Sequence, residues 1–341
     1  MSDLNLFSPS KELLSSLKVP FDDKLVIVIN HFLPANGSHL FNEPTFFKLH
    51  SLSNRDYFFQ LVRIKDSRVV GTLAFHEISK GFYASPGRGT FGGLNLNEKL
   101  EFQTVEKFLH AVNDFLRQQG AQTIRICCAP AGHDVSLFAV VFNILTRQGF
   151  EPTRPELNYQ MQINEQTFIN RIEYGNVKRI RKTKRTGFLS ECISIVQLPA
   201  VHQLIAENRS HQGIEISMTY AELYQMAVCF PERIHLFATY RDASRLDMVA
   251  AAVCLSLRSD LLYVLYWGDA KGMSTFSPVA MLAETIYNFC AVQGFKLLDV
   301  GISTLHAQPN FGLINFKRNL GFTESLKLEM VWHGQASERN I

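Results

Sequence analysis

Two loops in this chain combine glycine with cationic side chains, a composition typical of anion-binding loops. Gly87–Gly93 has the sequence GRGTFGG, and Asp269–Pro278 has the sequence DAKGMSTFSP. Glycine lets a phosphate approach backbone N–H groups, and the start of a helix adds the positive end of its dipole. The alternative for the first loop is a turn-rich segment shaped for packing. The candidate anion-binding residues are Arg88, Gly89, Gly92, Gly93, Lys271, Gly272, Ser274 and Ser277.

A third candidate for anion binding is the basic run Lys178–Arg185, which has the sequence KRIRKTKR. Arg181 and Arg185 are four residues apart and would share one face of a helix, with Lys178 beside them. Paired arginines bind phosphate or carboxylate groups through two parallel hydrogen bonds. The other interpretation of this run is a solvated helix face that binds nothing.

The composition predicts an ordinary globular protein of about two domains. The chain has 341 residues, of which 46% are apolar and 19% charged. No stretch approaches the roughly 18 uninterrupted apolar residues of a membrane-spanning helix. The first residues lack the basic start and apolar core of a signal peptide. We therefore expect a cytoplasmic protein without a membrane span.

Charge and cysteine usage limit the class of protein further. The net charge is +3 and the run Lys178–Arg185 carries +6, so the rest of the chain carries −3 and does not itself indicate nucleic-acid binding. The six cysteines have no C-x-x-C spacing and lie mostly in apolar runs, which favours buried, reduced thiols. No Cys/His cluster has the spacing of metal ligands, so no metal site is expected.

The positions of helices, strands and glycines repeat along the chain. Ser85-Pro86, a helix, Gly120-Ala121, a strand, a helix and Gly149-Phe150 form the first copy. The second copy starts 192 residues later, with Ser277-Pro278, and has Gly294-Phe295 and Gly321-Phe322 at the matching places. An alternating polar and apolar run follows each closing Gly-Phe. A repeat of this length indicates a duplicated domain rather than a solenoid unit.

Periodicity predicts the elements that would position these loops. Amphipathic spacing predicts helices over 100–119, 135–147, 165–186, 202–209, 220–228, 278–293 and 311–320. Short apolar or alternating runs predict strands over 25–29, 57–64, 68–78, 123–128, 234–241, 248–257, 261–267, 296–301 and 325–332. Residues 31–44 and 81–97 are expected to be irregular. The result is an α+β (α/β mixed sheet) architecture in two domains, 1–164 and 165–341.

Three stretches carry a resemblance to a known superfamily. Asn176–Gly187 is a basic segment that ends in glycine, Phe276-Ser277-Pro278 leads into a helix, and Asn310–Gly321 (NFGLINFKRNLG) places Phe-Lys shortly before Gly-Phe. Their order is similar to that of the GNAT (acyl-CoA N-acyltransferase) fold. A tandem pair of such domains resembles the Fem-type (FemAB-like) peptidyltransferases and their acetyltransferase relatives. The likeness covers roughly 165–333, and in the first half it rests on the repeat order alone.

The resemblance implies a donor, an acceptor and a place for each. The donor would be acetyl-CoA or another acyl-CoA as co-substrate, with its pyrophosphate on the N–H groups of one of the two glycine-containing loops. The acceptor would be a small-molecule or peptide amine near Lys178, Arg181 and Arg185. Because Fem-type enzymes take aminoacyl-tRNA, tRNA is the alternative donor.

The resemblance also assigns roles at the reaction centre. The lysine of the Phe-Lys pair, Lys317, would stabilise the oxyanion that forms when an amine attacks a thioester or ester. The other interpretation is a surface lysine on a short helix. Direct transfer needs a base for the amine proton, and Asp299 or His306 could serve. No G-x-S-x-G motif is present, which fits direct transfer without a covalent intermediate.

A different class of function stays open at this point. Neither loop matches the [QR]-x-x-G-x-[GA] pattern that GNAT enzymes use for CoA, which favours a non-catalytic binding protein on the same fold. The Phe-Lys pair and the glycine-containing loops favour the enzyme.

Overall fold

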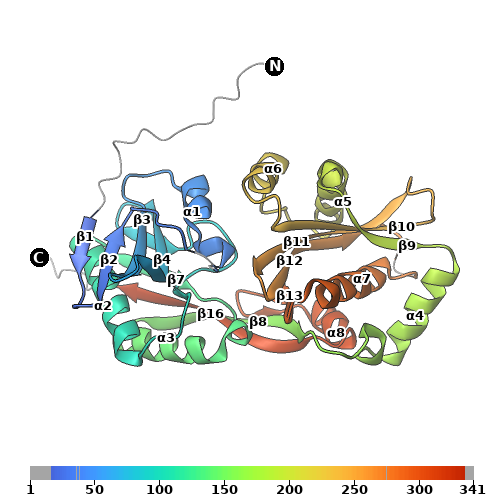
Figure 1. The fold of residues 1–341 in the computed structure, drawn as a ribbon. Helices are drawn as coiled ribbons and strands as arrows, with labels where there is room; N and C mark the ends of the chain where they lie inside the picture. Colours follow the sequence, from blue (N-terminus) through green and yellow to red (C-terminus); the bar gives the residue numbers. More distant parts are fainter. Residues whose placement is uncertain (1–16, 36, 38, 274, 335–341) are drawn as a thin grey trace, which may run out of the picture. The chain divides into compact units, whose positions relative to one another are not determined.

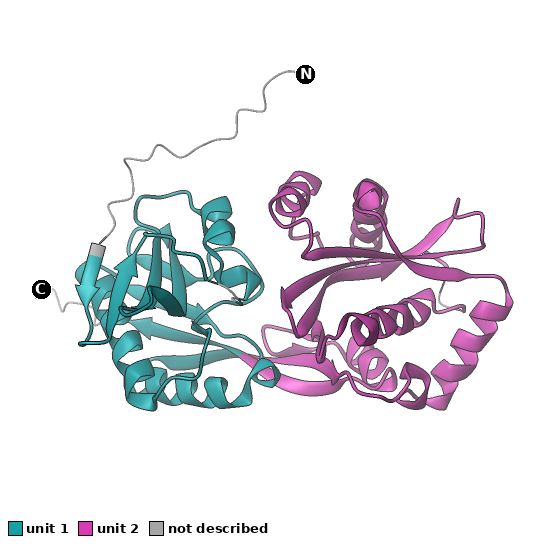
Figure 2. Cartoon of the chain, viewed as in Figure 1, with its two compact units in different colours: residues 1–154, 328–341 teal, residues 155–327 magenta. Residues whose placement is uncertain are grey.

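The computed structural model describes residues 17–35, 37, 39–273 and 275–334, which form two compact units (Figure 2). Unit 1 contains the described residues up to Arg154 together with those from Leu328 onward, and unit 2 is Pro155–Lys327. The boundary expected at 164 is therefore displaced. The chain passes from one unit to the other inside two long strands, β8 (Glu151–Gln162) and β16 (Thr323–His333).

Unit 1 is built on one mixed sheet, most of whose strands are labelled in Figure 1. All neighbouring strands are antiparallel except β5 and β7, which run parallel. The strand order is β1 (Leu17–Pro20), β2 (Leu25–Ile29), β3 (Tyr57–Arg63), β4 (Arg68–Ser79), β5 (Phe82–Ser85), β7 (Thr123–Cys127) and β16, with β6 (Asn95–Leu96) paired to β4.

Two amphipathic helices cover the core of unit 1. The buried face of α2 (Phe102–Gln118) includes Phe108 and Leu109 at the helical spacing seen in the sequence, and Gly120 follows with a φ of +86°. In α3 (Val135–Arg147), the carboxylate of Asp134 caps the first turn by accepting from the Leu137 N–H at 2.9 Å. The shorter helices are η1 (Leu40–Asn42), α1 (Pro44–His50) and η2 (Ala131–His133).

Unit 2 contains the second sheet. Its strand order is β8, β13 (Leu297–Ile302), β12 (Leu261–Asp269), β11 (Met248–Arg258), β10 (Ile234–Tyr240) and β9 (Leu189–Ile193). A short hairpin, β14 (Thr304–Leu305) and β15 (Gln308–Pro309), follows β13. The helices are α4 (Tyr174–Arg185), α5 (Leu198–His211), α6 (Tyr220–Cys229), α7 (Pro278–Gln293) and α8 (Phe311–Asn319), with short η3 (Phe168–Asn170) and η4 (Ile195–Gln197).

Helices cover both faces of the unit 2 sheet. Helix α5 packs on β11 and β12 from one side, and α7 packs on β10 and β11 from the other (Figure 1). The apolar run of β11 is buried from Val249 to Leu257, as expected for a strand covered on both faces. The α+β mixed sheet predicted from the sequence is thereby confirmed, in two compact units.

Several local expectations were wrong. The helix expected over 165–186 begins only at Tyr174, after η3, and the segment 81–97 contains β5. Ser85-Pro86 and Ser277-Pro278 are not equivalent, because α7 begins at Pro278 whereas α2 begins at Phe102, 16 residues after Pro86. Cys192 and Cys229 are exposed rather than buried, although all six cysteines are free thiols.

Candidate functional site

The parallel pairing of β12 with β13 stops early and leaves two strand ends at one place in unit 2. The pairing runs only from Leu261 opposite Leu297 to Tyr263 opposite Asp299, although β12 continues to Asp269. In sheets with parallel strands, ligands bind beyond the carboxyl ends of such strands. The segments that leave these two ends are the loop before α7 and the stretch that contains the β14–β15 hairpin.

Lys317 on α8 reaches the end of β13. Its side chain is fully buried, and Nζ donates to the carbonyl oxygens of Gly301 and Ile302, each at 2.9 Å. Burial lowers the pKa of the Lys317 ammonium to about 7, and the charge of Asp299 opposes that shift. The alternative interpretation of a surface lysine is thus wrong, and Lys317 is a buried amine whose pKa lies near neutral pH.

Asp299 organises the same turn from the other side. The carboxylate is fully buried and accepts from the Gly301 N–H at 2.6 Å and from Asn158 Nδ2 at 2.9 Å. Gly301 has a φ of +73°, a conformation that glycine adopts at little cost. The structure therefore brings Asp299 and Lys317 together around Gly301, with both Asp299 oxygens engaged in hydrogen bonds.

Strand β8 supplies a buried polar face that the sequence analysis missed. The Glu156 carboxylate accepts from the Thr304 hydroxyl and from the Ala307 N–H, the latter at 3.3 Å. The Leu157 N–H donates to the Thr304 hydroxyl at 2.9 Å. These contacts anchor the β14–β15 hairpin to β8. The signal was the alternation of polar and apolar residues over 156–160, which usually indicates a strand with its polar face in water.

His306 lies at the turn of this hairpin. Both His306 and Ala307 have positive φ values, 50° and 64°, which suit a two-residue hairpin turn. The imidazole is exposed, and no hydrogen bond or ion pair within the described part of the chain joins it to Lys317 or Asp299. Of the three predicted catalytic residues, the structure thus brings together two.

The loop before α7 is open to solvent. Lys271 and Gly272 are exposed, and a Cβ atom built on Gly272 would meet no atom within 4 Å. Ser277 precedes α7 in the left-handed conformation, with a φ of 49°, and Pro278 occupies the first turn. Ser274 lies outside the described residues. An exposed cation and the N-terminus of a 16-residue helix therefore lie together here.

The basic helix α4 lies beside that loop. Thr183 Oγ1 donates to the Phe276 carbonyl at 2.6 Å, and the rings of Phe188 and Phe276 stack with centroids 5.0 Å apart. The predicted acceptor-binding residues Lys178, Arg181 and Arg185 are all exposed. Lys178 Nζ lies 4.4 Å from the centre of the Tyr174 ring. Arg181 and Arg185 have no ion-pair partner in the described ranges.

The glycine-rich loop of unit 1 is packed rather than open. The Gly92 N–H donates to the Cys127 carbonyl at 2.8 Å, and Phe91 is buried. A Cβ atom would lie 2.5 Å from the His76 ring at Gly87 and 2.8 Å from Pro86 at Gly92. Gly93 is likewise buried and donates to Ser85 Oγ at 3.0 Å. These glycines permit close packing at the end of β7, and only Arg88 and Gly89 are exposed.

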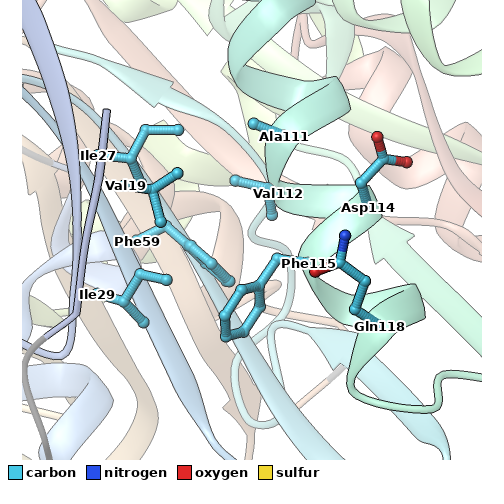
Figure 3. A pocket seen from close by; sticks show the side chains of 9 residues that line it. All are labelled: Val19, Ile27, Ile29, Phe59, Ala111, Val112, Asp114, Phe115 and Gln118. Carbon is cyan, nitrogen blue, oxygen red and sulfur yellow. The ribbon is translucent and has the colours of Figure 1, made fainter. Parts of the chain in front are cut away.

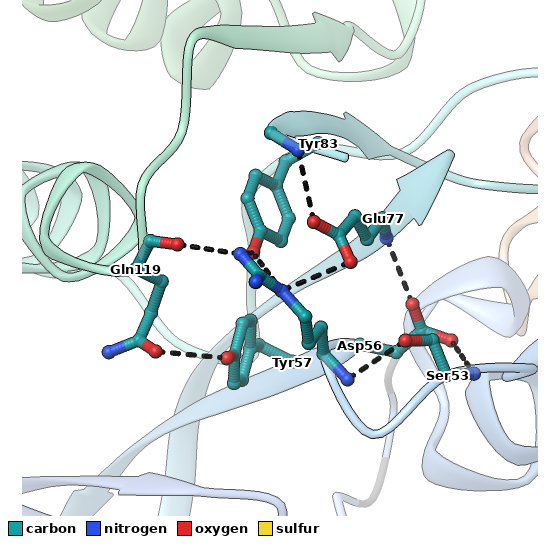
Figure 4. Close-up of polar contacts among 8 residues, drawn as sticks. Ser53, Asp56, Tyr57, Glu77, Tyr83 and Gln119 are labelled. Atoms are coloured by element: carbon teal, nitrogen blue, oxygen red, sulfur yellow. Dashed lines mark hydrogen bonds and ion pairs between the residues drawn. The ribbon is translucent and has the colours of Figure 1, made fainter. Parts of the chain in front are cut away.

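A second group of polar residues in unit 1 forms a structural network (Figure 4). Arg55 pairs with Glu77 at 3.0 Å and donates to the Tyr83 hydroxyl at 2.8 Å and to the Gln119 carbonyl at 2.6 Å. Asp56 accepts from the Glu77 N–H at 2.9 Å. Burial raises the pKa of Tyr83, so its phenol stays protonated at neutral pH. The network ties β3, β4 and β5 to the end of α2.

Unit 1 also contains an apolar cavity of about 240 Å³ between its first strands and α2 (Figure 3). Ile27, Ile29 and Phe59 form the sheet side of the lining. The one carboxylate in the lining, Asp114, is paired with Arg117 at 3.2 Å and with His110 at 3.0 Å. This lining offers no unengaged charged group for chemistry.

Two kinds of feature are absent from the described residues. Across 17–35, 37, 39–273 and 275–334, no group of three or more His, Cys, Asp or Glu side chains is arranged to hold a metal ion. Within the same ranges, no helix has both the length and the apolar character needed to cross a membrane.

Comparison with known proteins identifies the fold through structure alone. No family model matches the chain, and no curated protein matches its sequence. Among solved structures, FemX is 13% identical with a TM-score of 0.66, over 88% of this chain and 93% of FemX. L-PGS from Bacillus licheniformis is 11% identical with a TM-score of 0.55, over 87% of each chain. A conserved protein of unknown function from Bacteroides thetaiotaomicron is 10% identical with a TM-score of 0.54, over 89% of this chain and 94% of that one. The chain therefore shares its fold with FemX, in line with the resemblance to Fem-type proteins predicted from the sequence.

Proposed function

We propose that this protein transfers an acyl or aminoacyl group to an amine, at a site in unit 2 centred on Lys317. The observation that carries the proposal is a fully buried lysine, held by two carbonyl oxygens at the place where the β12–β13 pairing ends. Burying an ammonium group is costly, so a fold that keeps one at a strand end favours a functional explanation.

In the proposed step, the amine nitrogen attacks the carbonyl carbon of the donor and a C–N bond forms. The carbonyl electron pair moves to oxygen, and the Lys317 ammonium stabilises that oxyanion. Collapse of the tetrahedral centre breaks the C–S bond of a thioester, or the C–O bond of an ester, and the leaving group departs with the electron pair. The proton lost by the amine passes to a base.

We assign the base role to His306, whose exposed imidazole lies on the hairpin that Glu156 anchors, outside the contacts of Lys317 and Asp299, so this role requires the bound amine to extend to the hairpin turn. Asp299 was the other candidate. Because both of its oxygens already accept hydrogen bonds, we assign it to positioning the turn at Gly301 and to holding a negative charge near Lys317.

The donor is proposed to bind with its phosphates at the loop before α7, where Lys271, Gly272 and the helix N-terminus converge. The packed glycines of unit 1 favour unit 2 as the single donor site. The leading donor is acetyl-CoA or another acyl-CoA. The acceptor is a small-molecule or peptide amine near α4.

One observation favours aminoacyl-tRNA as an alternative donor. The exposed cations of α4 lie next to the proposed donor loop, through the contacts of Thr183 and Phe188 with Phe276. A helix with Arg181 and Arg185 free of ion pairs among the described residues offers more positive charge than a single pyrophosphate requires.

The experiment is an acyl-transfer assay of the wild type, Lys317→Met and Lys296→Met, with acetyl-CoA and with aminoacyl-tRNA as donors. Lys296 is an exposed lysine just before β13 and serves as the matched control. We expect Lys317→Met to lower turnover at least tenfold and Lys296→Met to leave it unchanged. Equal turnover of the three proteins would contradict the assignment of Lys317.

A further inference from the structure

Two hydrogen-bond donors at the end of β13 have no acceptor in the described structure. Lys317 uses two N–H groups on Gly301 and Ile302, and its third N–H has no oxygen or nitrogen acceptor among the described residues, with Nζ 5.5 Å from the centre of the Tyr159 ring. Ser303 is 2% exposed, and its Oγ atom has no hydrogen-bond partner in the described ranges. The two residues are adjacent through Ile302.

The hydroxyl of Ser303 differs from the buried polar side chains nearest to it in sequence and on β8, although Gln160 Oε1, opposite Asp299, also lacks a partner in the described ranges. Asp299, Glu156 and Thr304 are buried, and each has at least two hydrogen bonds with its neighbours. The backbone of Ser303 is also engaged, with its N–H donating to the Leu157 carbonyl at 2.8 Å and its carbonyl accepting from the Asn310 N–H at 3.0 Å. Of the polar groups of Ser303, only the hydroxyl lacks a hydrogen-bond partner in the described ranges. Buried polar groups without a partner are rare in native proteins and point to a missing ligand or a function.

Covalent geometry keeps the two donors close. Lys317 Nζ lies 2.9 Å from the Ile302 carbonyl oxygen, and that oxygen belongs to the peptide group that leads into Ser303. Standard bond lengths then keep Ser303 Oγ within roughly 8 Å of Nζ. Two donors that each lie about 2.9 Å from one shared oxyanion are within about 6 Å of each other, a separation that this bound allows.

We propose that the Ser303 hydroxyl and the third N–H of Lys317 together form the oxyanion pocket of the transferase site. Ser303 donates its hydroxyl hydrogen to an oxygen on the tetrahedral carbon, and no proton or electron pair is exchanged with it. This inference rests on the proposed function, and it adds a second donor that no motif in the sequence indicated.

The test compares Ser303→Ala, Ser303→Cys and Thr304→Val in the full-length protein, by steady-state transfer kinetics and thermal unfolding. Removal of one preorganised oxyanion donor typically lowers kcat by about 10²–10³-fold. We expect Ser303→Ala to lower kcat at least tenfold with KM within threefold of the wild type. Its Tm should not fall, because the hydroxyl makes no hydrogen bond in the described structure. Ser303→Cys keeps a weak donor and should recover part of the lost kcat.

Thr304→Val provides the structural control. The Thr304 hydroxyl makes two hydrogen bonds, so removal of that hydroxyl should lower Tm. The inference is overturned if Ser303→Ala keeps kcat within threefold of the wild type, or if its loss of kcat is accompanied by the same fall in Tm as in Thr304→Val. If Ser303→Ala is neutral while Lys317→Met is inactive, only the second donor is wrong. If the wild type transfers nothing from either donor, the proposed function itself fails.

Discussion

Asp299 and Lys317 bind the two polar groups of the same residue, Gly301. The Asp299 carboxylate accepts the Gly301 N–H at 2.6 Å, and Lys317 Nζ donates to the Gly301 carbonyl at 2.9 Å. The charge of Asp299 also raises the pKa of Lys317 against the effect of burial. Burial is therefore the main influence on the protonation of Lys317, while Asp299 both opposes that influence and holds the turn to which the cation binds.

The first prediction concerns the pH dependence of turnover. Because the cationic form of Lys317 is the one that stabilises an oxyanion, kcat should fall as pH rises through about 7, the pKa of this side chain. The rising limb at lower pH would come from other groups, such as the acceptor amine or its base. A pH–rate profile of kcat with saturating substrates measures this, and a profile that only rises between pH 6 and pH 9 would contradict the cationic role.

Replacement of Asp299 by asparagine should move that descending limb. Asparagine keeps an oxygen for the Gly301 N–H but removes the negative charge that raises the pKa of Lys317. The pKa of Lys317 should therefore fall, and the limb should shift to lower pH. The same pH–rate experiment on Asp299→Asn tests this. If the limb stays in place while kcat drops, Asp299 acts through geometry alone.

Stability should also depend on pH through Lys317. The folded-state pKa of about 7 lies below the ordinary lysine pKa of 10.5, so the unfolded chain binds more protons between these two values. The free energy of unfolding should consequently rise with pH across this window, by up to about 1.4 kcal/mol per pH unit from this one group. Chemical denaturation at several pH values should show this component in the wild type and in Lys296→Met. Lys317→Met should lack it.

The exposed arginines of α4 allow the two donors to be distinguished. Reversal of both charges, in Arg181→Glu/Arg185→Glu, should weaken tRNA binding at least tenfold and reduce its salt dependence if aminoacyl-tRNA is the donor. The fold should be retained, because both side chains are exposed and lack ion pairs in the described ranges. Filter binding at two salt concentrations measures this effect. If the wild type binds no tRNA, acyl-CoA is left as the donor to test.

The sequence predicted the positions of helices better than the pairing of strands. The stripe of α2 and the bounds of α3 and α7 follow from local periodicity, because one apolar face decides each helix. Strand β5 was missed because its four residues lie in a glycine-rich stretch and are ordered by parallel pairing with β7. Such non-local pairing leaves no local pattern.

The same limit applies to the candidate site. Lys317 was found through a short motif, but its burial depends on the turn at Gly301, which only the folded chain brings to α8. Glu156 and Asn158 lie at alternate positions of a strand, a pattern typical of a polar face exposed to solvent. Alternation alone does not show whether another part of the chain covers that face. Ser303 has no sequence signal at all, since its importance rests on a missing hydrogen-bond partner.

Calorimetric titration of the wild type, Lys271→Glu and Arg88→Glu with acetyl-CoA, and separately with aminoacyl-tRNA, tests the central claim most directly. Both substitutions reverse one exposed charge in a glycine-containing loop, one in each unit. The account predicts that at least one donor binds the wild type, that Lys271→Glu weakens this binding at least tenfold, and that Arg88→Glu leaves it unchanged. No binding of either donor, or a loss of binding in Arg88→Glu alone, would contradict a donor site in unit 2.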